Sequence, residues 1–338
     1  MPATSETSTL FQQLHLNRRH ALLASVATLA SAALPAWANA AYPNRAVKIV
    51  APFSPGQGVD LLARALANEL NKATKQAFTV DNRPGGGTVL GTSAVAAAAA
   101  DGYTLLAVGN SFAVNPSLHN KLPYDSKKDF SPISLLASTP HVLVAKPQLQ
   151  ANTLAEVLAA AKANPGKMNY ASSGNGTAPH LAGEALNKAA GIQLTHVPYK
   201  GQGPTVTALM AGEVDLMFAN LLDVLPYIQS KKMKAIAISA LKRDPLLPQL
   251  PTMDEAGLPG FESSSWYGLM TRTGTPKDVI ERLNTLVTTA LKSPELAKQY
   301  EGKGLNLTPS SSAEFASFLD KEYVKYAEIV KFAGVKID

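Results

Sequence analysis

The sequence predicts an α/β protein built from two lobes, and three observations lead to that prediction. Short apolar runs rich in β-branched residues alternate with glycine-rich turns and helical patterns, which is typical of parallel strands covered by helices. The alternation occurs in two successive blocks that show no obvious sequence identity, and a proline-rich stretch at 245–259 separates the second block from the C-terminal helices. With 338 residues, 46% of them hydrophobic, the chain can form two domains of roughly 100–200 residues each.

The first block begins with a strand predicted over 46–51. A turn at 53–59 leads into a helix from Asp60, where leucine and alanine recur at helical spacing. The rest of the block is predicted as a strand at 78–80, a turn at 83–87, a helix at 88–100 and a strand at 104–108. We expect the first lobe to comprise residues 41–140 together with 262–338.

The second block is predicted to begin with a strand near His141, and residues 141–261 form the expected second lobe. Its strands are predicted at 141–145, 169–171, 193–197, 214–218 and 235–238, with helices at 154–163, after Thr177 and from 201–204. A strand at 266–270 and helices at 276–292 and 313–332 follow the proline-rich stretch. We expect these last helices to return and pack against the first lobe.

Residues 1–40 have the pattern of a secretory signal peptide. Arg18 and Arg19 precede an uncharged, alanine- and leucine-rich stretch, and Ala38-Asn39-Ala40 fits the small-x-small cleavage rule. The apolar run is too short for a membrane anchor and is interrupted by Pro35. Cleavage after about Ala40 and a periplasmic mature protein are therefore expected. The paired arginines also fit a twin-arginine signal, so the Sec and twin-arginine routes both stay open.

The composition excludes several functional classes. The chain has no cysteine, which rules out a thiol nucleophile, a cysteine-ligated zinc site and an iron–sulfur cluster. The net charge is +6, but the basic residues are dispersed and form no stripe interleaved with aromatic residues, so nucleic-acid binding is not expected. Neither the G-x-S-x-G nor the H-E-x-x-H motif occurs. No metal or cofactor is predicted.

Four glycine-rich turns, at 54–59, 84–87, 172–177 and 201–204, each connect a strand to a helix. The first N–H groups of a helix lack intrahelical partners and lie at the positive end of the helix dipole, and glycine allows a ligand to approach the backbone closely. Each turn is therefore a candidate anion site. Since complete phosphate-binding motifs are missing from these turns, several of them in two lobes favour a carboxylate ligand.

Some polar residues allow more than one interpretation. His180, in the first turn of a helix, could act as a general base with Ser173 or Thr177 in a secreted α/β hydrolase or transferase, although a core or capping role is favoured. Asp60 could cap its helix or act in acid–base chemistry. Arg83 could clamp a carboxylate, as in an organic-acid receptor of another transporter system, or pair with a surface acid. His119 is interpreted as a surface loop residue and His196 as structural.

Several longer motifs then identify a family. The matching stretches are Asp81–Gly87, Asp101–Leu106, Leu122–Asp125, Gly174–Glu184, His196–Gly201, Pro251–Gly257 and Trp266–Leu269. Nearly the whole chain after residue 40 resembles the Bug family, the periplasmic solute receptors of tripartite tricarboxylate transporters. The resemblance implies a type 2 periplasmic-binding-protein fold, which is α/β and two-lobed, with a cleft between the lobes that closes on a small organic acid.

The resemblance also implies a set of ligand-binding residues, with one carboxylate held by backbone groups and ordered waters of the first lobe. In the first lobe these residues are Ser54, Pro55, Gly56, Gln57, Gly58, Val59, Asp60, Asn110 and Ser111. In the second lobe they are Ser173, Gly174, Thr177, His180, Tyr199, Lys200 and Gly201, with Asn220 at the far end of the cleft.

Two departures from the family pattern bear on the ligand. Ser54 and Gln57 replace a proline and a glycine of the first turn, and Gln57 adds an amide there. Ala219-Asn220 replaces the usual Asp-Asn, and loss of that carboxylate favours a dicarboxylate, hydroxy acid or aromatic acid over a ligand with an ammonium group at that end.

We therefore predict a monomeric, non-enzymatic receptor. Its expected partners are a small organic acid and the membrane permease subunits of a tripartite tricarboxylate transporter, with a sensor kinase as a further possible partner. The sequence leaves open which acid is bound, and whether the receptor serves transport, signalling or both.

Overall fold

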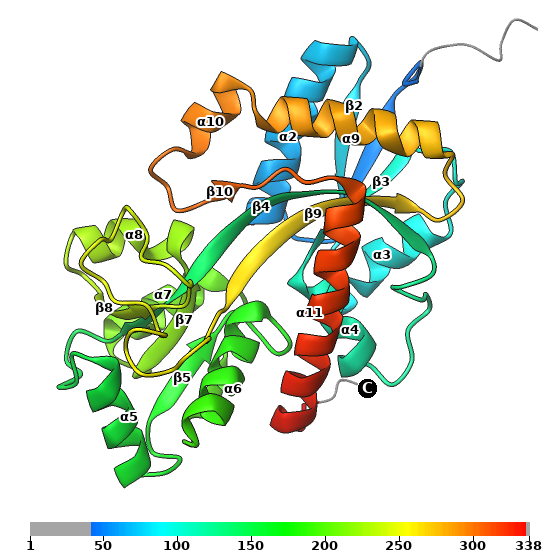
Figure 1. Ribbon diagram of the computed structural model, residues 1–338. Coiled ribbons are helices and arrows are strands. Elements are labelled where there is room, and N and C mark those ends of the chain that lie inside the picture. Colours follow the sequence, from blue (N-terminus) through cyan, green and yellow to red (C-terminus); the bar gives the residue numbers. More distant parts are fainter. Residues whose placement is uncertain (1–41, 336–338) are drawn as a thin grey trace, which may run out of the picture. The chain divides into compact units, whose positions relative to one another are not determined.

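The computed structural model describes residues 42–335, so the predicted signal peptide and its cleavage site lie outside the described residues. The fold is that of the compact unit that begins at Arg45. It is a mixed α/β structure in which strands and helices alternate, as the sequence predicts (Figure 1).

The strands are β1 (Val47–Ala51), β2 (Phe78–Asn82), β3 (Thr104–Gly109), β4 (Phe130–Ala145), β5 (Asn169–Ser172), β6 (Thr195–Pro198), β7 (Leu216–Asn220), β8 (Lys234–Ile238), β9 (Ser264–Arg272) and β10 (Asn306–Leu307). The helices are α2 (Gly58–Thr74), α3 (Val89–Ala96), α4 (Asn110–Leu118), α5 (Leu154–Ala163), α6 (Ala178–Ala190), α7 (Gln202–Ala211), α8 (Leu221–Gln229), α9 (Lys277–Leu291), α10 (Pro294–Tyr300) and α11 (Ser312–Ala333), with a 3₁₀ turn η2 (Gly86–Thr88) before α3.

The described strands form one sheet with two segments that share β4. The order is β2-β1-β3-β9-β4-β7-β5-β6, and β8 and β10 also pair with β4. Residues Phe130–Pro140 of β4 pair with β9, and β10 pairs with the same half. Residues His141–Ala145 pair with β7 on one side and with β8 on the other. We call these the first and second sheet segments. β4 and β9 run side by side through the centre of Figure 1.

The length of β4 differs from the prediction, which placed a strand only at 141–145. The structure shows a single strand of 16 residues from Phe130 to Ala145. Pro132 and Pro140 hide this strand in the sequence, because proline lacks the N–H group that a central strand normally donates. The pairing of β4 is irregular between Pro132 and Ser134 and again between Leu135 and Ala137, which accommodates such residues.

The C-terminal helices pack against the first sheet segment, as predicted. Helix α9 contacts α2 and β4, and α11 contacts α4 and β4. Helix α11 also contacts α6 of the second segment, which the sequence did not indicate. A serine–glutamate capping box at Ser311 and Glu314 fixes the start of α11. This helix therefore spans both segments beside the point where β4 and β9 cross between them.

Among residues 42–335, buried apolar clusters hold each segment together internally. One lies in the first segment and includes Phe112, Trp266 and Phe315. The other two cover opposite faces of the second segment, one beneath α7 and α8 and the other beneath α5 and α6. Within residues 42–335, no helix combines the length and the apolar character needed to cross a bilayer.

Candidate functional site

The topology brings the carboxyl ends of two sets of parallel strands face to face. β1 and β3 run in the same direction as β4, because two antiparallel steps through β9 relate them, whereas β7 runs opposite to β4 and parallel to β5. Tyr267 of β9 pairs with Gly109 at the end of β3 on one side and with Ala137 of β4 on the other. Asn220 at the end of β7 pairs with His141 of β4. Four residues of a strand span about 13 Å. The turns that contain the predicted site residues therefore oppose each other at the crossing.

The turn after β1 is held by a buried carboxylate. Asp60 Oδ2 accepts a hydrogen bond from the Gly56 N–H at 2.8 Å, and Oδ1 accepts one from Asn82 Nδ2 at 2.8 Å. Arg64 Nε lies 3.0 Å from Oδ1. Burial alone would raise the pKa of Asp60, but the hydrogen bonds from Gly56, Asn82 and Arg64 outweigh it and lower the pKa. Asp60 is therefore ionised and fixes the shape of this turn.

Asp60 is not the helix cap that the sequence suggested as one possibility. Helix α2 begins at Gly58 with Gln57 in the N-cap position, and Asp60 lies in its first turn. The helical hydrogen bonds start with Leu61 N–H donating to Gln57 O at 2.9 Å. Within the described chain, this leaves the N–H groups of Gly58, Val59 and Asp60 as donors at the helix tip. The Gly56 N–H already donates to the Asp60 side chain, so fewer N–H groups of this turn can bind an anion than the sequence predicted.

The turn after β5 is held by neutral histidines instead. The Gly176 N–H donates to His180 Nδ1 at 3.0 Å, and the His180 ring stacks on His196 with centroids 3.9 Å apart. His196 Nε2 lies 2.7 Å from Ser172 Oγ. Burial lowers the pKa of His180 to about 3, with a smaller contribution from His196, and burial lowers the pKa of His196 to about 4. Both rings are therefore uncharged at neutral pH.

This arrangement does not resemble a catalytic pair. The Thr177 hydroxyl donates to Gly174 O at 2.7 Å, and within the described residues neither Ser173 nor Thr177 hydrogen bonds to His180. Ser172 does pair with His196, but Ser172 is fully buried and its hydroxyl also bonds to Gly174. A buried serine that closes its own turn cannot meet a substrate, so the geometry fits the favoured core role of His180.

The other predicted residues fall into two groups. Tyr199 and Gly201 are tied to the neighbouring turn, since their N–H groups donate to Ser172 O at 3.0 Å and Ser173 O at 3.2 Å. Lys200 between them is exposed. Nearby, at the start of α7, Gln202 Nε2 is buried and has no hydrogen-bond partner in the described chain. Gln202 is not among the residues predicted to bind ligand.

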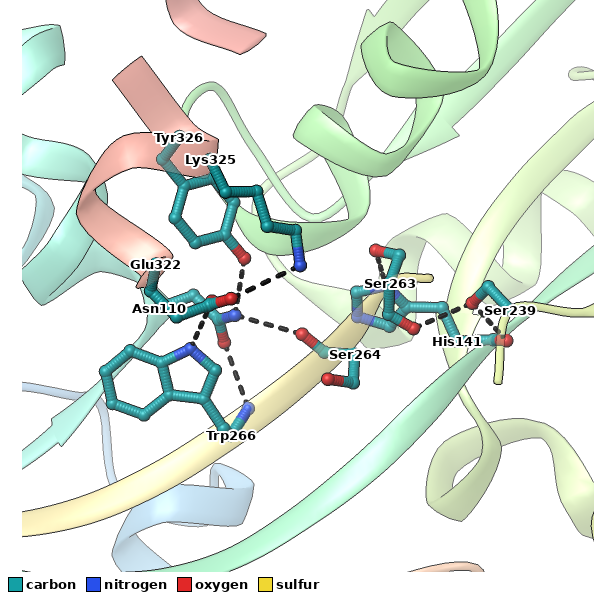
Figure 2. A network of polar contacts seen from close by, with 9 residues as sticks. All are labelled: Asn110, His141, Ser239, Ser263, Ser264, Trp266, Glu322, Lys325 and Tyr326. Atoms are coloured by element: carbon teal, nitrogen blue, oxygen red, sulfur yellow. Dashed lines mark hydrogen bonds and ion pairs between the residues drawn. The ribbon is translucent and has the colours of Figure 1, made fainter. Parts of the chain in front are cut away.

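Asn110 contributes its side chain to the interior rather than to the turn surface (Figure 2). Its Nδ2 donates to Ser264 O at 2.9 Å and to Tyr326 Oη at 2.7 Å, and its Oδ1 accepts from the Trp266 N–H at 3.1 Å. Ser111, the next residue of α4, is half-buried. Any contact of Asn110 with a ligand would therefore come from its backbone.

A second group of polar contacts surrounds His141 at the crossing and adjoins the first through the consecutive residues Ser263 and Ser264 (Figure 2). His141 Nδ1 lies 2.8 Å from Ser263 Oγ and Nε2 lies 3.0 Å from Ser265 Oγ, and Ser239 Oγ donates to His141 O at 2.7 Å. Burial lowers the pKa of His141 to about 3, and the positive charge of Lys325 also lowers it. The Asn220 amide nearby raises the pKa, although its Oδ1 forms no hydrogen bond of normal geometry in the described chain. A neutral histidine thus links β4 to the strand that returns across the crossing.

At the end of β7, Asn220 has an unsatisfied side chain. Its Nδ2 donates to Asp223 Oδ2 at 2.9 Å, while its Oδ1 is buried without a hydrogen-bond partner in the described chain. Asp223 and Tyr267, which are not among the residues predicted to bind ligand, lie close to this end of β7. A first-turn acid after a strand was the available signal for Asp223, since it follows Asn220 by three residues.

The contacts of Arg83 decide between the two roles that the sequence left open for it. Arg83 Nε lies 2.9 Å from Asp81 Oδ2, which matches pairing with a surface acid.

His119 was interpreted as a surface loop residue, and this is wrong: the residue is half-buried and its Nε2 is buried without a partner in the described chain. No group of three or more histidines or acids that could hold a metal ion occurs within residues 42–335.

A cavity of about 470 Å³ lies elsewhere, between α6, the loop 257–263 and α11. None of the residues predicted to bind ligand line it, except that it borders the same helix α6 that carries His180. The candidate site is therefore defined by the opposed turns and not by this cavity.

Comparison with known proteins agrees with this geometry. Residues 62–335 match the model of the tripartite tricarboxylate transporter family receptor. Protein BugT of Bordetella pertussis is 34% identical over 326 residues, covering 96% of this chain and 100% of BugT. A Rhodopseudomonas palustris protein solved with adipate, Rpa4515, has a TM-score of 0.79 and 31% identity over 87% of this chain and 99% of its own.

MatC from Rhodopseudomonas palustris, solved with bound malate, has a TM-score of 0.76 and 32% identity over 86% of this chain and 100% of its own. These matches confirm the expected two-lobed α/β fold of periplasmic solute-binding proteins. The family model covers well over half of the chain and the relatives align almost end to end. The chain therefore belongs to the tripartite tricarboxylate transporter receptor family, among the Bug proteins.

Proposed function

We propose that this protein is a periplasmic receptor without catalytic activity that binds a small organic acid between two lobes. Residues 41–140 with 262–338 form the first lobe and residues 141–261 the second. The change of the β4 partner from β9 to β7 between Pro140 and His141 supports this boundary. The observation that carries the proposal is that β3 and β7 end facing each other at the crossing and that each is followed by a helix.

The tip of α2 supplies the grip on the ligand carboxylate. The N–H groups of Gly58, Val59 and Asp60 lie outside the helical ladder, and the α2 dipole adds a positive potential there. The side chain of Asp60 keeps the turn in place from behind. Backbone donors of this kind hold a carboxylate without an arginine clamp, and Arg83 is engaged with Asp81.

The second lobe closes over the ligand with the turns after β5, β6 and β7. Ser173, Gly174, Thr177 and His180 belong to the first of these turns, Tyr199–Gly201 to the second and Asn220 to the third. The His180–His196 stack makes the first turn rigid, so this part moves as a body. Binding then stabilises a closed arrangement of the lobes.

A secreted hydrolase or transferase using His180 is the alternative. His180 Nδ1 accepts a hydrogen bond from Gly176, and burial keeps the pKa of the ring far below neutral, which suits a structural histidine better than a general base. Absence of turnover by the pure protein, with binding retained, separates the receptor from this enzyme.

The remaining parts of the proposal concern location and partners. We expect the mature protein to be a monomer in the periplasm after export and cleavage near Ala40. Its liganded form would deliver the acid to the permease subunits of a tripartite tricarboxylate transporter, or signal through a sensor kinase. Pulldown from membranes with and without ligand distinguishes delivery from signalling.

Native mass spectrometry of freshly purified protein and thermal melting with a panel of organic acids test the proposal. A bound acid should appear as a discrete mass increment, and an excess of one hundredfold over the Kd should stabilise the protein by about 2.7 kcal/mol. Acids and their methyl esters form matched pairs, and only the free acids should bind. No shift with any acid, or equal shifts with the esters, would overturn the proposal.

A further inference from the structure

Polar groups with unused hydrogen-bonding capacity lie near the end of β7. Asn220 Oδ1 is buried and makes no hydrogen bond in the described chain. Asp223, in the first turn of α8, is half-buried and accepts a single hydrogen bond, from Asn220 Nδ2 at 2.9 Å. Tyr267, which lies nearby on β9, is only 6% exposed.

Asp223 lacks a compensating cation. Within the described chain it takes part in no ion pair, whereas Asp60, the corresponding first-turn acid of α2, is paired with Arg64. Burial raises the pKa of Asp223, and the hydrogen bond from Asn220 opposes this rise only in part. A carboxylate that is partly removed from water and has one hydrogen bond but no cation nearby is unfavourable in free energy. A ligand group that donates a hydrogen bond to it offsets this unfavourable free energy.

Tyr267 connects these groups to the first lobe. A β-carbon placed on Gly58 would lie 2.7 Å from Tyr267 Oη, so the hydroxyl lies against the tip of α2. Burial and then the Asp223 carboxylate raise the pKa of Tyr267, so the Tyr267 hydroxyl and the Asp223 carboxylate lie within electrostatic reach of each other. Tyr267 is thus near both the α2 tip and Asp223.

The start of α8 is fixed against the first sheet segment. The Leu222 N–H donates to Thr139 Oγ1 of β4 at 3.5 Å, and a β-carbon on Gly304 would lie 2.6 Å from the Leu221 side chain. Because the two residues before Asp223 are packed in this way, the start of α8 that carries Asp223 is held against the first sheet segment.

We propose that Asp223, with Tyr267, determines specificity by accepting a hydrogen bond from the ligand. The ligand is then a carboxylic acid that carries a hydroxyl or ammonium donor toward the second lobe while its carboxylate lies at the α2 tip. This inference rests on the proposed receptor function. It also revises the expectation from Ala219, because Asp223 supplies a carboxylate four residues further along the chain.

Matched ligand series test this inference by isothermal titration calorimetry on the full mature protein. Each series keeps the carbon skeleton and changes one substituent: propionate, lactate and alanine; succinate, malate and aspartate; glutarate, 2-hydroxyglutarate and glutamate. In the series that binds, we expect the hydroxyl or ammonium member to bind at least about tenfold more tightly than the unsubstituted acid.

The substitution Asp223→Asn should remove most of that preference while the unsubstituted acid keeps its affinity within about threefold. Tyr267→Phe, which removes only the hydroxyl, should weaken the substituted acid by a smaller factor. Asp278→Asn is the matched control, because Asp278 is an exposed first-turn acid of α9, and it should leave every affinity unchanged. Melting of the ligand-free variants shows whether each is folded. If Asp223→Asn does not fold, Tyr267→Phe tests the inference in its place.

The outcomes separate the two proposals. Binding of acids by the wild type without preference for a donor substituent, or an unchanged preference in Asp223→Asn, overturns the inference and leaves the receptor function standing. Equal weakening of all members by Asp223→Asn also overturns it, since that result indicates a structural role. Failure of the wild type to bind any acid overturns the receptor function, and this inference with it.

Discussion

The turns after β1 and β5 solve one structural problem with different chemistry. In each, a glycine with positive φ, Gly56 or Gly176, donates its N–H to the side chain four residues later. In the first turn that side chain is the carboxylate of Asp60, and in the second it is the neutral ring of His180. Both helices continue with leucine one residue later and with alanine and leucine at the fifth and sixth residues, as Leu61-Ala65-Leu66 and Leu181-Ala185-Leu186.

The difference shows how each turn is stabilised. Asp60 is charged and is compensated by Arg64 and Asn82, so its contribution is electrostatic. His180 is uncharged and stacks on His196, so its contribution depends on packing and on staying neutral. The first helix tip presents three N–H donors, at residues 58–60, whereas Pro179 leaves the second tip with only those of Ala178 and His180. The first turn is therefore the better anion site.

Gly183→Ala should have the largest effect on stability and should act on the second turn only. A β-carbon on Gly183 would lie 2.1 Å from the Tyr170 ring, whereas Ala63 of α2 already carries a methyl group at the corresponding position. We expect a loss of about 3 kcal/mol in the free energy of unfolding, measured by urea denaturation. Gly203→Ala is the control, since nothing lies within 4 Å of its added carbon. Equal stability of both variants would contradict the packing described for α6.

Mild acid should weaken the second turn before the first. His180 has a pKa near 6.5 in the unfolded chain and about 3 in the folded one, so between these values the unfolded state binds more protons and stability falls as the pH falls. Its contribution should decrease by about 2 kcal/mol from pH 7 to pH 5. His180→Asn keeps an acceptor for Gly176 and removes the titrating ring, so its stability should depend less on pH by that amount. Identical pH profiles of wild type and variant would refute this.

Asp60→Asn should weaken the first turn without changing its response to mild acid. The variant loses the ion pair with Arg64 and places an amide donor toward the Asn82 amide, which should cost about 1.5 kcal/mol. Because the pKa of Asp60 is lowered, its carboxylate is ionised at both pH 7 and pH 5, and the deficit should be the same at both. Asp320→Asn, an exposed acid of α11, is the control. A deficit that disappears at pH 5 would contradict this assignment.

Gly58→Ala should have the smallest effect. The added carbon meets Tyr267 Oη at 2.7 Å, but this atom ends a side chain and can shift, so we expect a loss of about 1 kcal/mol. The second turn already has Ala178 at the corresponding position. In a Tyr267→Phe background the loss should largely vanish, which a double-mutant cycle measures. Additive effects of the two substitutions would show that the contact with the hydroxyl is not the cause.

Much of the fold is encoded in local patterns. The strands at 46–51, 104–108 and 214–218 and the helices at 154–163 and 276–292 are recovered within about two residues. The short strand β10 and helix α10 were not anticipated, because two and seven residues carry too little periodicity. The glycine-rich turns at 54–59, 84–87 and 172–177 lie between a strand and a helix as predicted, since glycine at such a junction is a local signal, whereas most of 201–204 belongs to α7.

The partners of individual side chains were not accessible in the same way. That Asn110 bonds to Ser264 and Tyr326, and that Asp223 lies near Tyr267, depends on residues 44 to 216 positions apart in the chain. No periodic pattern specifies such a pair, because each side chain meets its partner only after the sheet has formed.

The sequence by itself thus determined the alternation of elements, the glycine turns and the family, because these depend on residue type and short-range spacing. Only the tertiary structure decided that β4 passes through both sheet segments and that strands of opposite direction end facing each other at the crossing. It also decided that the Gly56 and Gly176 N–H groups are satisfied internally. The physical reason is that hydrogen-bond partners and burial are set by long-range pairing, which the local sequence constrains but does not specify.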